Sequence, residues 1–389
     1  SWREVNAYLA STAGHGIARN SVLTLVVITQ GLTEAQLILD AVHTLSSQHP
    51  SRAIIVSTDP NQPGQEMQAH VATYVGESAA SYGEDIVIEA QRDAMRHLPG
   101  VVLPLIVSGL PSVLWWTGEP PWGTQLLESL VDGSDRFVVD TSEVTHVEKS
   151  FVSLADIMRR KLARCAVSDI SWTSQAPWRD MIAQFFDPVE MRPYLDGIER
   201  VTIEYAAGEE DAPTNSAQAY LFSGWLASRL DWHVSGAQPG GVDGSRQHTL
   251  RDDNGHVVNL EINARYNVPQ RHWWNREPQA TPGGNGAHAG SSSSPWVRVG
   301  ALMSVHITSR VNGQRGTFAV ARERDLAHAT TLCQAPNCNI PSQTVHLQSI
   351  GERELLADQL SFLGHDPVYE EALSATALLV GGTGRRSML

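Results

Sequence analysis

The sequence predicts an α/β amino-terminal domain with a mostly parallel sheet, followed by an α+β domain. In the first part of the chain, short apolar runs alternate with helix-like patterns, which is typical of strands buried on both faces. Further along, polar and apolar residues alternate within strands, as in a sheet with one exposed face. A chain of 389 residues also exceeds one ordinary domain. We therefore place the two domains at residues 1–165 and 166–389.

Hydrophobic periodicity locates the elements of the first domain. Helices with one apolar face are expected at residues 32–45, 122–131 and 150–165. Trp122 falls on the apolar face of the second helix and Cys165 on that of the third. Strands rich in β-branched residues are expected at residues 22–29, 53–57, 85–89, 111–116 and 136–140.

The second domain mixes helices with half-exposed strands. A helix should begin near Pro177, because the first turn tolerates proline, and end at Pro188. Residues 275–295 are rich in Gly, Ser and Pro without periodicity, which predicts a flexible loop. Two further helices are expected at 217–230 and 352–363, and strands at 201–205, 256–262, 297–308 and 316–321.

Charge and composition exclude several classes of partner. A net charge of −14 repels phosphate backbones and anionic lipid. No apolar run approaches the roughly 20 residues that span a bilayer, and residues 1–4 show no signal-peptide pattern. The chain has only three cysteines, which is typical of a cytoplasmic protein. Its acidic charge and the lack of an apolar span predict that neither nucleic acid nor a membrane is a partner.

Established catalytic motifs are absent from the sequence. It contains no phosphate-binding P-loop, no dinucleotide-binding glycine pattern after a strand, no nucleophile elbow and no H-E-x-x-H. Its fifteen histidines are scattered, so we predict neither a metal nor a cofactor. A site built from distant carboxylates would escape this search. The carboxyl ends of the parallel strands, with Asp140 and Ser142, are therefore kept as an alternative ligand site.

Cys333 and Cys338 are the redox candidates. Pro336 and Asn337 between them favour a turn that could bring the two sulfurs within bonding distance. Spacing alone favours two ordinary thiols over a disulfide. A disulfide closing so short a loop would contribute only about 2 kcal/mol and would suit a switch better than a staple.

The chain has eleven tryptophans, of which five lie close together in sequence. Tryptophan is enriched at the energetic centres of protein interfaces, so these rings are candidates for partner contacts. The simpler interpretation is that they fill the protein's own core. The five are Trp115, Trp116, Trp122, Trp172 and Trp178.

These tryptophans lie in motifs that resemble those of the OpcA family. The motifs are LPSVLWWTGEPPW at residues 110–122, DRFVVDTS at 135–142, DISWTSQAPWRDMIAQFFD at 169–187, and AYLFSGWLASRLDW at 219–232. Residues 49–56 also fit, so the resemblance extends over most of the chain.

The resemblance implies a function that composition does not. OpcA proteins are assembly and allosteric-activator partners of glucose-6-phosphate dehydrogenase and are not known as enzymes. In photosynthetic bacteria the family is linked to thioredoxin-dependent control, which makes the cysteine pair a candidate switch. We therefore expect a non-catalytic partner of the dehydrogenase. Its candidate contacts are the five tryptophans with Glu119 and Arg179. The rival hypothesis is an enzyme or sugar-phosphate-binding protein that uses the strand ends at Asp140.

Overall fold

A computed structural model describes residues 21–45, 50–59, 63–75, 82–210, 214–238, 245–271, 296–336, 338–347, 352–361 and 364–381. The predicted loop at 275–295 lies outside these residues. The chain divides into two compact units. The first comprises Ser1–Ile170 and Ile350–Glu370, and the second comprises Ser171–Ser349 and Glu371–Leu389. The sequence placed all residues after 165 in the second domain, whereas 350–370 belong to the first unit.

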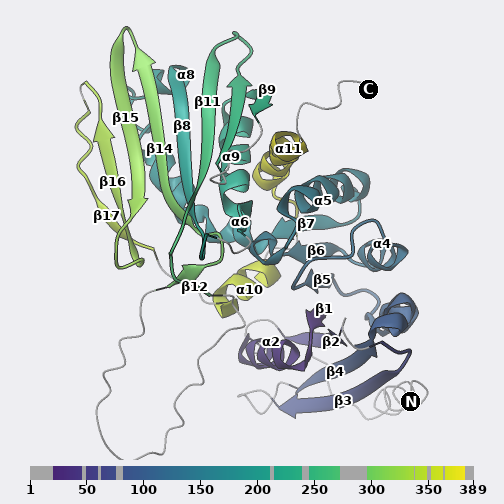
Figure 1. The fold of residues 1–389 in the computed structure, drawn as a ribbon. Helices are drawn as coiled ribbons and strands as arrows, with labels where there is room; N and C mark the ends of the chain where they lie inside the picture. Colours follow the sequence, from purple (N-terminus) through teal and green to yellow (C-terminus); the bar gives the residue numbers. More distant parts are fainter. Residues whose placement is uncertain are drawn as a thin grey trace, which may run out of the picture. The chain divides into compact units, whose positions relative to one another are not determined.

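The first unit contains a seven-stranded sheet in the order β3-β4-β2-β1-β5-β6-β7 (Figure 1). Every neighbouring pair is parallel except β3 and β4, which confirms the predicted mostly parallel sheet. The five predicted strands correspond to β1 (Leu23–Gln30), β2 (Ser51–Asp59), β4 (Tyr82–Gln91), β5 (Ser112–Trp116) and β6 (Arg136–Val139). The sequence missed β3 (Met67–Val75), whose residues are half or fully exposed where described, and the four-residue β7 (Ala166–Asp169).

The described helices of the first unit are α2 (Leu32–Leu45), α3 (Leu98–Val102), α4 (Gln125–Asp132), α5 (Val147–Lys161) and α10 (Glu352–Ser361). Of these, α2 has its predicted bounds, α4, α5 and α10 differ from theirs by a few residues, and α3 was not predicted. Trp122 lies before α4 instead of on its apolar face. Gly123 has a φ of +74°, and Thr124 caps the helix by accepting a hydrogen bond from the Leu127 N–H. Cys165 follows α5 and is nevertheless buried.

The described part of the first unit also contains three short 3₁₀ helices. They are η1 (Arg92–His97), η2 (Leu103–Leu105) and η3 (Thr141–Glu143). The last of these directly follows β6, at the carboxyl end of the sheet.

The second unit contains an eight-stranded mixed sheet in the order β17-β16-β15-β14-β8-β11-β10-β9 (Figure 1). Only the pair β8 and β11 is parallel. Gly300, with a φ of +68°, separates β14 from the short β13 (Val297–Arg298), so the predicted strand at 297–308 is two strands. The sheet strands are β8 (Ile198–Ala206), β9 (His233–Gln238), β10 (Arg246–Arg251), β11 (Val257–Arg265), β14 (Leu302–Val311), β15 (Gln314–Arg322), β16 (His328–Gln334) and β17 (Thr344–His346).

Helices cover one face of this sheet. Along β8, Val201, Ile203 and Tyr205 are buried while the residues between them are half exposed, as the alternation in the sequence predicted. The Phe318 ring of β15 packs against aromatic rings at the end of α7 and in α8. The helices against this sheet are α7 (Ala176–Gln184), α8 (Pro193–Asp196) and α9 (Ala217–Arg229). Two others, α6 (Ile170–Ser174) and α11 (Pro367–Gly381), begin in the first unit and continue into the second. The short β12 (Gln270–Arg271) pairs with β13.

Candidate functional site

The order of the first sheet reverses direction at β1. From β1 the chain continues to β2 on one side, and β5 lies on the other side. Ligands in open α/β sheets bind at such a reversal, beyond the carboxyl ends of the strands. Here those ends are Gln30 of β1 and Thr117, which follows β5.

Two buried side chains of the protein itself, Glu34 and Thr117, lie at this position. The carboxylate of Glu34, in the first turn of α2, accepts a hydrogen bond from the Gln30 N–H at 2.6 Å. Glu34 also shares a hydrogen bond with Thr117, whose hydroxyl lies 3.2 Å from the Ile28 carbonyl oxygen. The Gln30 amide lies against Gly118, where an added Cβ would stand 2.4 Å from Gln30 Nε2.

Burial shifts the pKa of Glu34. Loss of solvent raises the pKa of its carboxyl above the usual 4.5, and repulsion from Glu143 adds to this increase. The hydrogen bonds with Thr117 and with the Gln30 backbone oppose the increase. The first turn of α2 therefore holds an acidic group of the chain itself, at the place where an anionic ligand would otherwise bind.

The carboxyl ends of β6 and β7 are closed in the same way. The Asp140 carboxylate accepts hydrogen bonds from the Ser142 N–H at 3.1 Å and from the Ser142 hydroxyl at 2.7 Å. Asp169 accepts from the Thr141 N–H at 3.1 Å and from its hydroxyl at 2.6 Å. All four residues are at most 1% exposed. Asp140 and Ser142 therefore lie together in the structure, and their side chains are hydrogen-bonded to each other.

The loop between β5 and α4 presents the half-exposed members of the predicted contact set. The Glu119 carboxylate lies 2.9 Å from His146 Nδ1 and accepts a hydrogen bond from the Thr145 N–H. Trp122 is half buried, and its indole N–H donates to the buried Ser150 hydroxyl at 3.0 Å. These bonds hold the loop against the start of α5.

The other four candidate tryptophans are buried. Their exposed fractions are 4% for Trp115 and Trp116, 6% for Trp172 and 3% for Trp178. The Arg179 guanidinium lies 3.5 Å from the centroid of the Trp172 ring and donates to the Trp172 carbonyl oxygen at 2.7 Å. These rings therefore fill the core, which is the simpler of the two interpretations the sequence left open.

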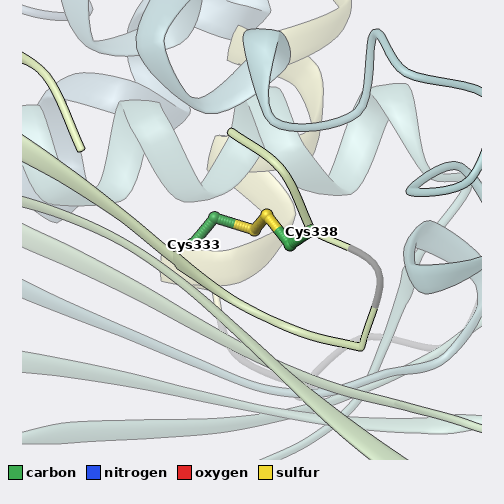
Figure 2. The surroundings of a disulfide bond; sticks show 2 residues. All are labelled: Cys333 and Cys338. Carbon is green, nitrogen blue, oxygen red and sulfur yellow. A yellow bond between two sulfur atoms is a disulfide. The ribbon is translucent and has the colours of Figure 1, made fainter. Parts of the chain in front are cut away.

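Cys333 and Cys338 form a disulfide (Figure 2). Cys333 lies in β16, and the Cys338 N–H donates to the Ala335 carbonyl oxygen in the turn that follows. Both residues are half buried. The third cysteine is no redox candidate, because burial raises the pKa of the Cys165 thiol to about 12.

The described residues hold neither a membrane-spanning helix nor a cluster of metal ligands. None of their helices is both long and apolar enough to cross a membrane. The same part of the chain contains no group of three or more His, Cys, Asp or Glu side chains placed to hold a metal ion.

Comparison with protein families shows to which family the chain belongs. The family described as the C-terminal domain of the glucose-6-phosphate dehydrogenase subunit matches residues 165–373, more than half of the chain. The family described as the N-terminal domain of the same protein matches residues 42–156. The chain belongs to the OpcA family. The resemblance seen in the tryptophan-containing motifs is thereby confirmed.

Relatives named as putative OxPP cycle proteins OpcA occur in cyanobacteria. One from Synechocystis is 29% identical over 49% of this chain and 39% of its own length. Another from Synechococcus elongatus is 25% identical over 86% of this chain and 69% of its own. A third from Nostoc punctiforme is 25% identical over 76% and 56%. The matched region thus spans well under half of the first relative.

Among solved structures, a 3-ketoreductase from Actinomadura kijaniata aligns with a TM-score of 0.46 and 10% identity, over 92% of this chain and 96% of its own. A biliverdin reductase from Synechocystis aligns with a TM-score of 0.41 and 10% identity, over 94% and 100%. No conclusion about activity follows at this similarity.

The sequence did not single out Glu34 or Asp169. The available signal for Glu34 was an acidic residue in the first turn of a helix directly after a buried strand. Asp169 begins one of the family motifs, but no local signal showed its role, because its partner Thr141 is 28 residues away.

Proposed function

We propose that this chain is a non-catalytic partner of glucose-6-phosphate dehydrogenase that promotes the assembly or allosteric activation of that enzyme. The observation that carries the proposal is the match of both domains of the dehydrogenase-associated family, which together extend over residues 42–156 and 165–373. An activator must bind the active form more tightly than the inactive one. A tenfold shift requires only about 1.4 kcal/mol of difference in affinity.

The closed strand ends support a non-catalytic role over the rival hypothesis. A sugar phosphate bound there would meet the buried Glu34 carboxyl at the start of α2. It would also find the Asp140 and Ser142 side chains bonded to each other. Binding would require breaking these hydrogen bonds inside the protein, which costs about 1–3 kcal/mol for each buried group left unpaired.

The loop between β5 and α4 is our candidate for the contact with the dehydrogenase. Of the five candidate tryptophans, only Trp122 is half exposed; the other four are buried. Its ring is held in place by Ser150, and the neighbouring Glu119 by His146. A pre-ordered aromatic side chain next to a charge loses little conformational freedom on binding, as is common at interface centres.

The direct test measures the cognate dehydrogenase with and without this chain. We expect a lower Michaelis constant or a higher maximal rate, together with co-elution of the two proteins in size-exclusion chromatography. Unchanged kinetics and separate elution would refute the proposal. Adding NADP together with glucose 6-phosphate to the chain alone, without any dehydrogenase, should produce no turnover. Turnover under those conditions would favour the rival.

Redox control through the disulfide is the finer part of the proposal. The two cysteines are only five residues apart in the sequence. In the chain-entropy model, a disulfide that closes so short a loop stabilises the fold by about 2 kcal/mol. A protein disulfide reductase such as thioredoxin could open it at little cost to folding. We expect activation of the dehydrogenase to differ between oxidised and reduced protein, and Cys333→Ser to abolish that difference. A redox response that survives in Cys333→Ser would place the switch elsewhere.

A further inference from the structure

One end of the eight-stranded sheet carries a groove of about 590 Å³. Four neighbouring strands contribute to it, all within the second unit. A volume of this size is typical of sites for small molecules. The side chains that matter for its chemistry are Glu199, Arg200, Asn259, Thr308, Arg310 and Arg315.

Strand register explains why these residues converge. Asn259 of β11 and Thr308 of β14 both lie opposite Arg200 of β8 and form one row across the sheet. Arg310 lies opposite Arg315 in the β14–β15 hairpin. The register of β14 against β8 shifts after Thr308, and irregularities of this kind redirect side chains at the ends of strands.

The groove is positively charged in an acidic protein. Its lining has three arginines and one glutamate, and the carboxylate of Glu261 pairs with Arg200, which leaves one net positive charge, whereas the whole chain carries −14. Arg310 Nε donates to Glu199 at 2.9 Å, and Arg200 Nη1 donates to Glu261 at 3.1 Å. These bonds orient the guanidinium groups and leave most of their N–H donors available. Within the residues that the structure describes, the exposed Arg315 side chain has no ion pair or hydrogen bond.

We propose that this groove binds a small anion through its phosphate group. Guanidinium groups match phosphate oxygens with paired N–H donors, and the net positive charge of the lining attracts the negative charge that a phosphate carries near neutral pH. The Thr308 hydroxyl and the Asn259 amide supply further donors. The site belongs to the second unit, whereas the carboxyl ends of β1 and β5 belong to the first. It does not depend on binding to the dehydrogenase.

Calorimetric titration of the full chain with inorganic phosphate, at constant ionic strength in chloride, tests the proposal. We expect saturable binding at one site. Arg315→Gln and Arg310→Gln should each weaken binding about tenfold, through loss of charge-assisted hydrogen bonds. Arg324→Gln removes an exposed arginine outside the groove and should leave the affinity unchanged. Unfolding midpoints would verify that each variant is folded.

A second titration, with glucose 6-phosphate, identifies the source of the phosphate group. Tighter binding of the ester than of inorganic phosphate indicates a phosphorylated metabolite, and equal binding indicates free phosphate. Two results would overturn the proposal. One is a response that does not saturate, and the other is an equal loss of affinity in Arg324→Gln and Arg315→Gln.

Discussion

Glu34 occupies a position that other α/β proteins leave for a ligand. The amino-terminal end of a helix after the first strand attracts anions, since its N–H groups are unpaired and its dipole is positive. In this chain the carboxyl of Glu34 accepts the N–H of Gln30 at that end. The buried Glu34 carboxyl thereby occupies the start of α2, next to the carboxyl end of β1.

Replacing Glu34 with Gln tests this role through pH. Burial raises the pKa of Glu34, so the folded protein binds the neutral carboxyl group's proton more tightly than the unfolded chain does. The contribution of Glu34 to the free energy of unfolding therefore falls as pH rises from below 4.5 through the raised pKa. An amide remains neutral and keeps an oxygen for the Gln30 N–H. Urea unfolding should therefore show Glu34→Gln gaining stability relative to wild type as pH rises from about 4 to about 7.5.

Glu190→Gln is the matched control, because Glu190 is exposed. It removes the same charge without changing a buried site. A Glu34→Gln difference that stays constant or shrinks with rising pH would contradict the proposed role.

Trp122→Ala tests the proposed contact. Truncating an aromatic side chain at the centre of an interface typically costs about 2 kcal/mol, so affinity for the dehydrogenase should fall about 30-fold in surface plasmon resonance. Trp225, which is also half buried but lies in α9 of the second unit, provides the control. Equal losses in Trp122→Ala and Trp225→Ala would argue against the loop as the contact.

At the scale of elements, α9 and α11 approach closely at Gly224. A Cβ at this position would stand 2.0 Å from Thr376 Oγ1 and 2.5 Å from the Ala372 carbonyl oxygen. Alanine normally stabilises a helix by about 1 kcal/mol relative to glycine. Here the missing side chain is instead what permits the packing of the two helices.

Gly224→Ala should therefore destabilise the second unit. Overpacking typically costs about 1–3 kcal/mol, because a backbone oxygen cannot move away as a flexible side chain could. Thermal unfolding would measure the loss. Gly100→Ala, in α3 with no atom within 4 Å of the added Cβ, should be neutral or slightly stabilising. A stable Gly224→Ala variant would show that α11 is free to shift.

At the scale of the whole chain, Arg136 connects β6 with the carboxy-terminal segment that belongs to the first unit. This buried arginine of β6 donates to the Ser168 hydroxyl at 3.1 Å, to Gln359 Oε1 at 3.0 Å and to the Gly364 carbonyl oxygen at 3.3 Å. Burial lowers the pKa of its guanidinium, which nevertheless stays charged at neutral pH. One side chain thus links two segments more than 200 residues apart.

Arg136→Met should loosen this segment. The substitution retains most of the apolar stem but leaves the buried Gln359 without its donor, at a cost of about 1–3 kcal/mol. Hydrogen exchange should accelerate in residues 352–370 more than in β1 or β2. Arg159→Met on α5 removes an exposed arginine and should leave exchange unchanged. Uniform acceleration across the first unit would indicate general destabilisation instead.

The hydrophobic pattern predicted the buried strands and long helices well. In such elements the spacing of apolar residues along the chain follows which side chains are buried. Val22 to Thr29 and Leu32 to Leu45 match β1 and α2 within one residue. The pattern missed β3 and β7. One is exposed at the edge, and the other has four residues, too few for a period to appear.

The sequence by itself determined the two kinds of sheet, the OpcA family and the absence of known catalytic motifs. These three features can be seen within single stretches of the sequence, as patterns of residue types or as long motifs. Tertiary structure alone decided that four of the five tryptophans are core, that Cys333 and Cys338 are bonded, and that Glu34 closes the strand ends. It also assembled the arginine groove from four strands. Burial and convergence depend on residues far apart in the chain, and no single stretch of sequence contains that information.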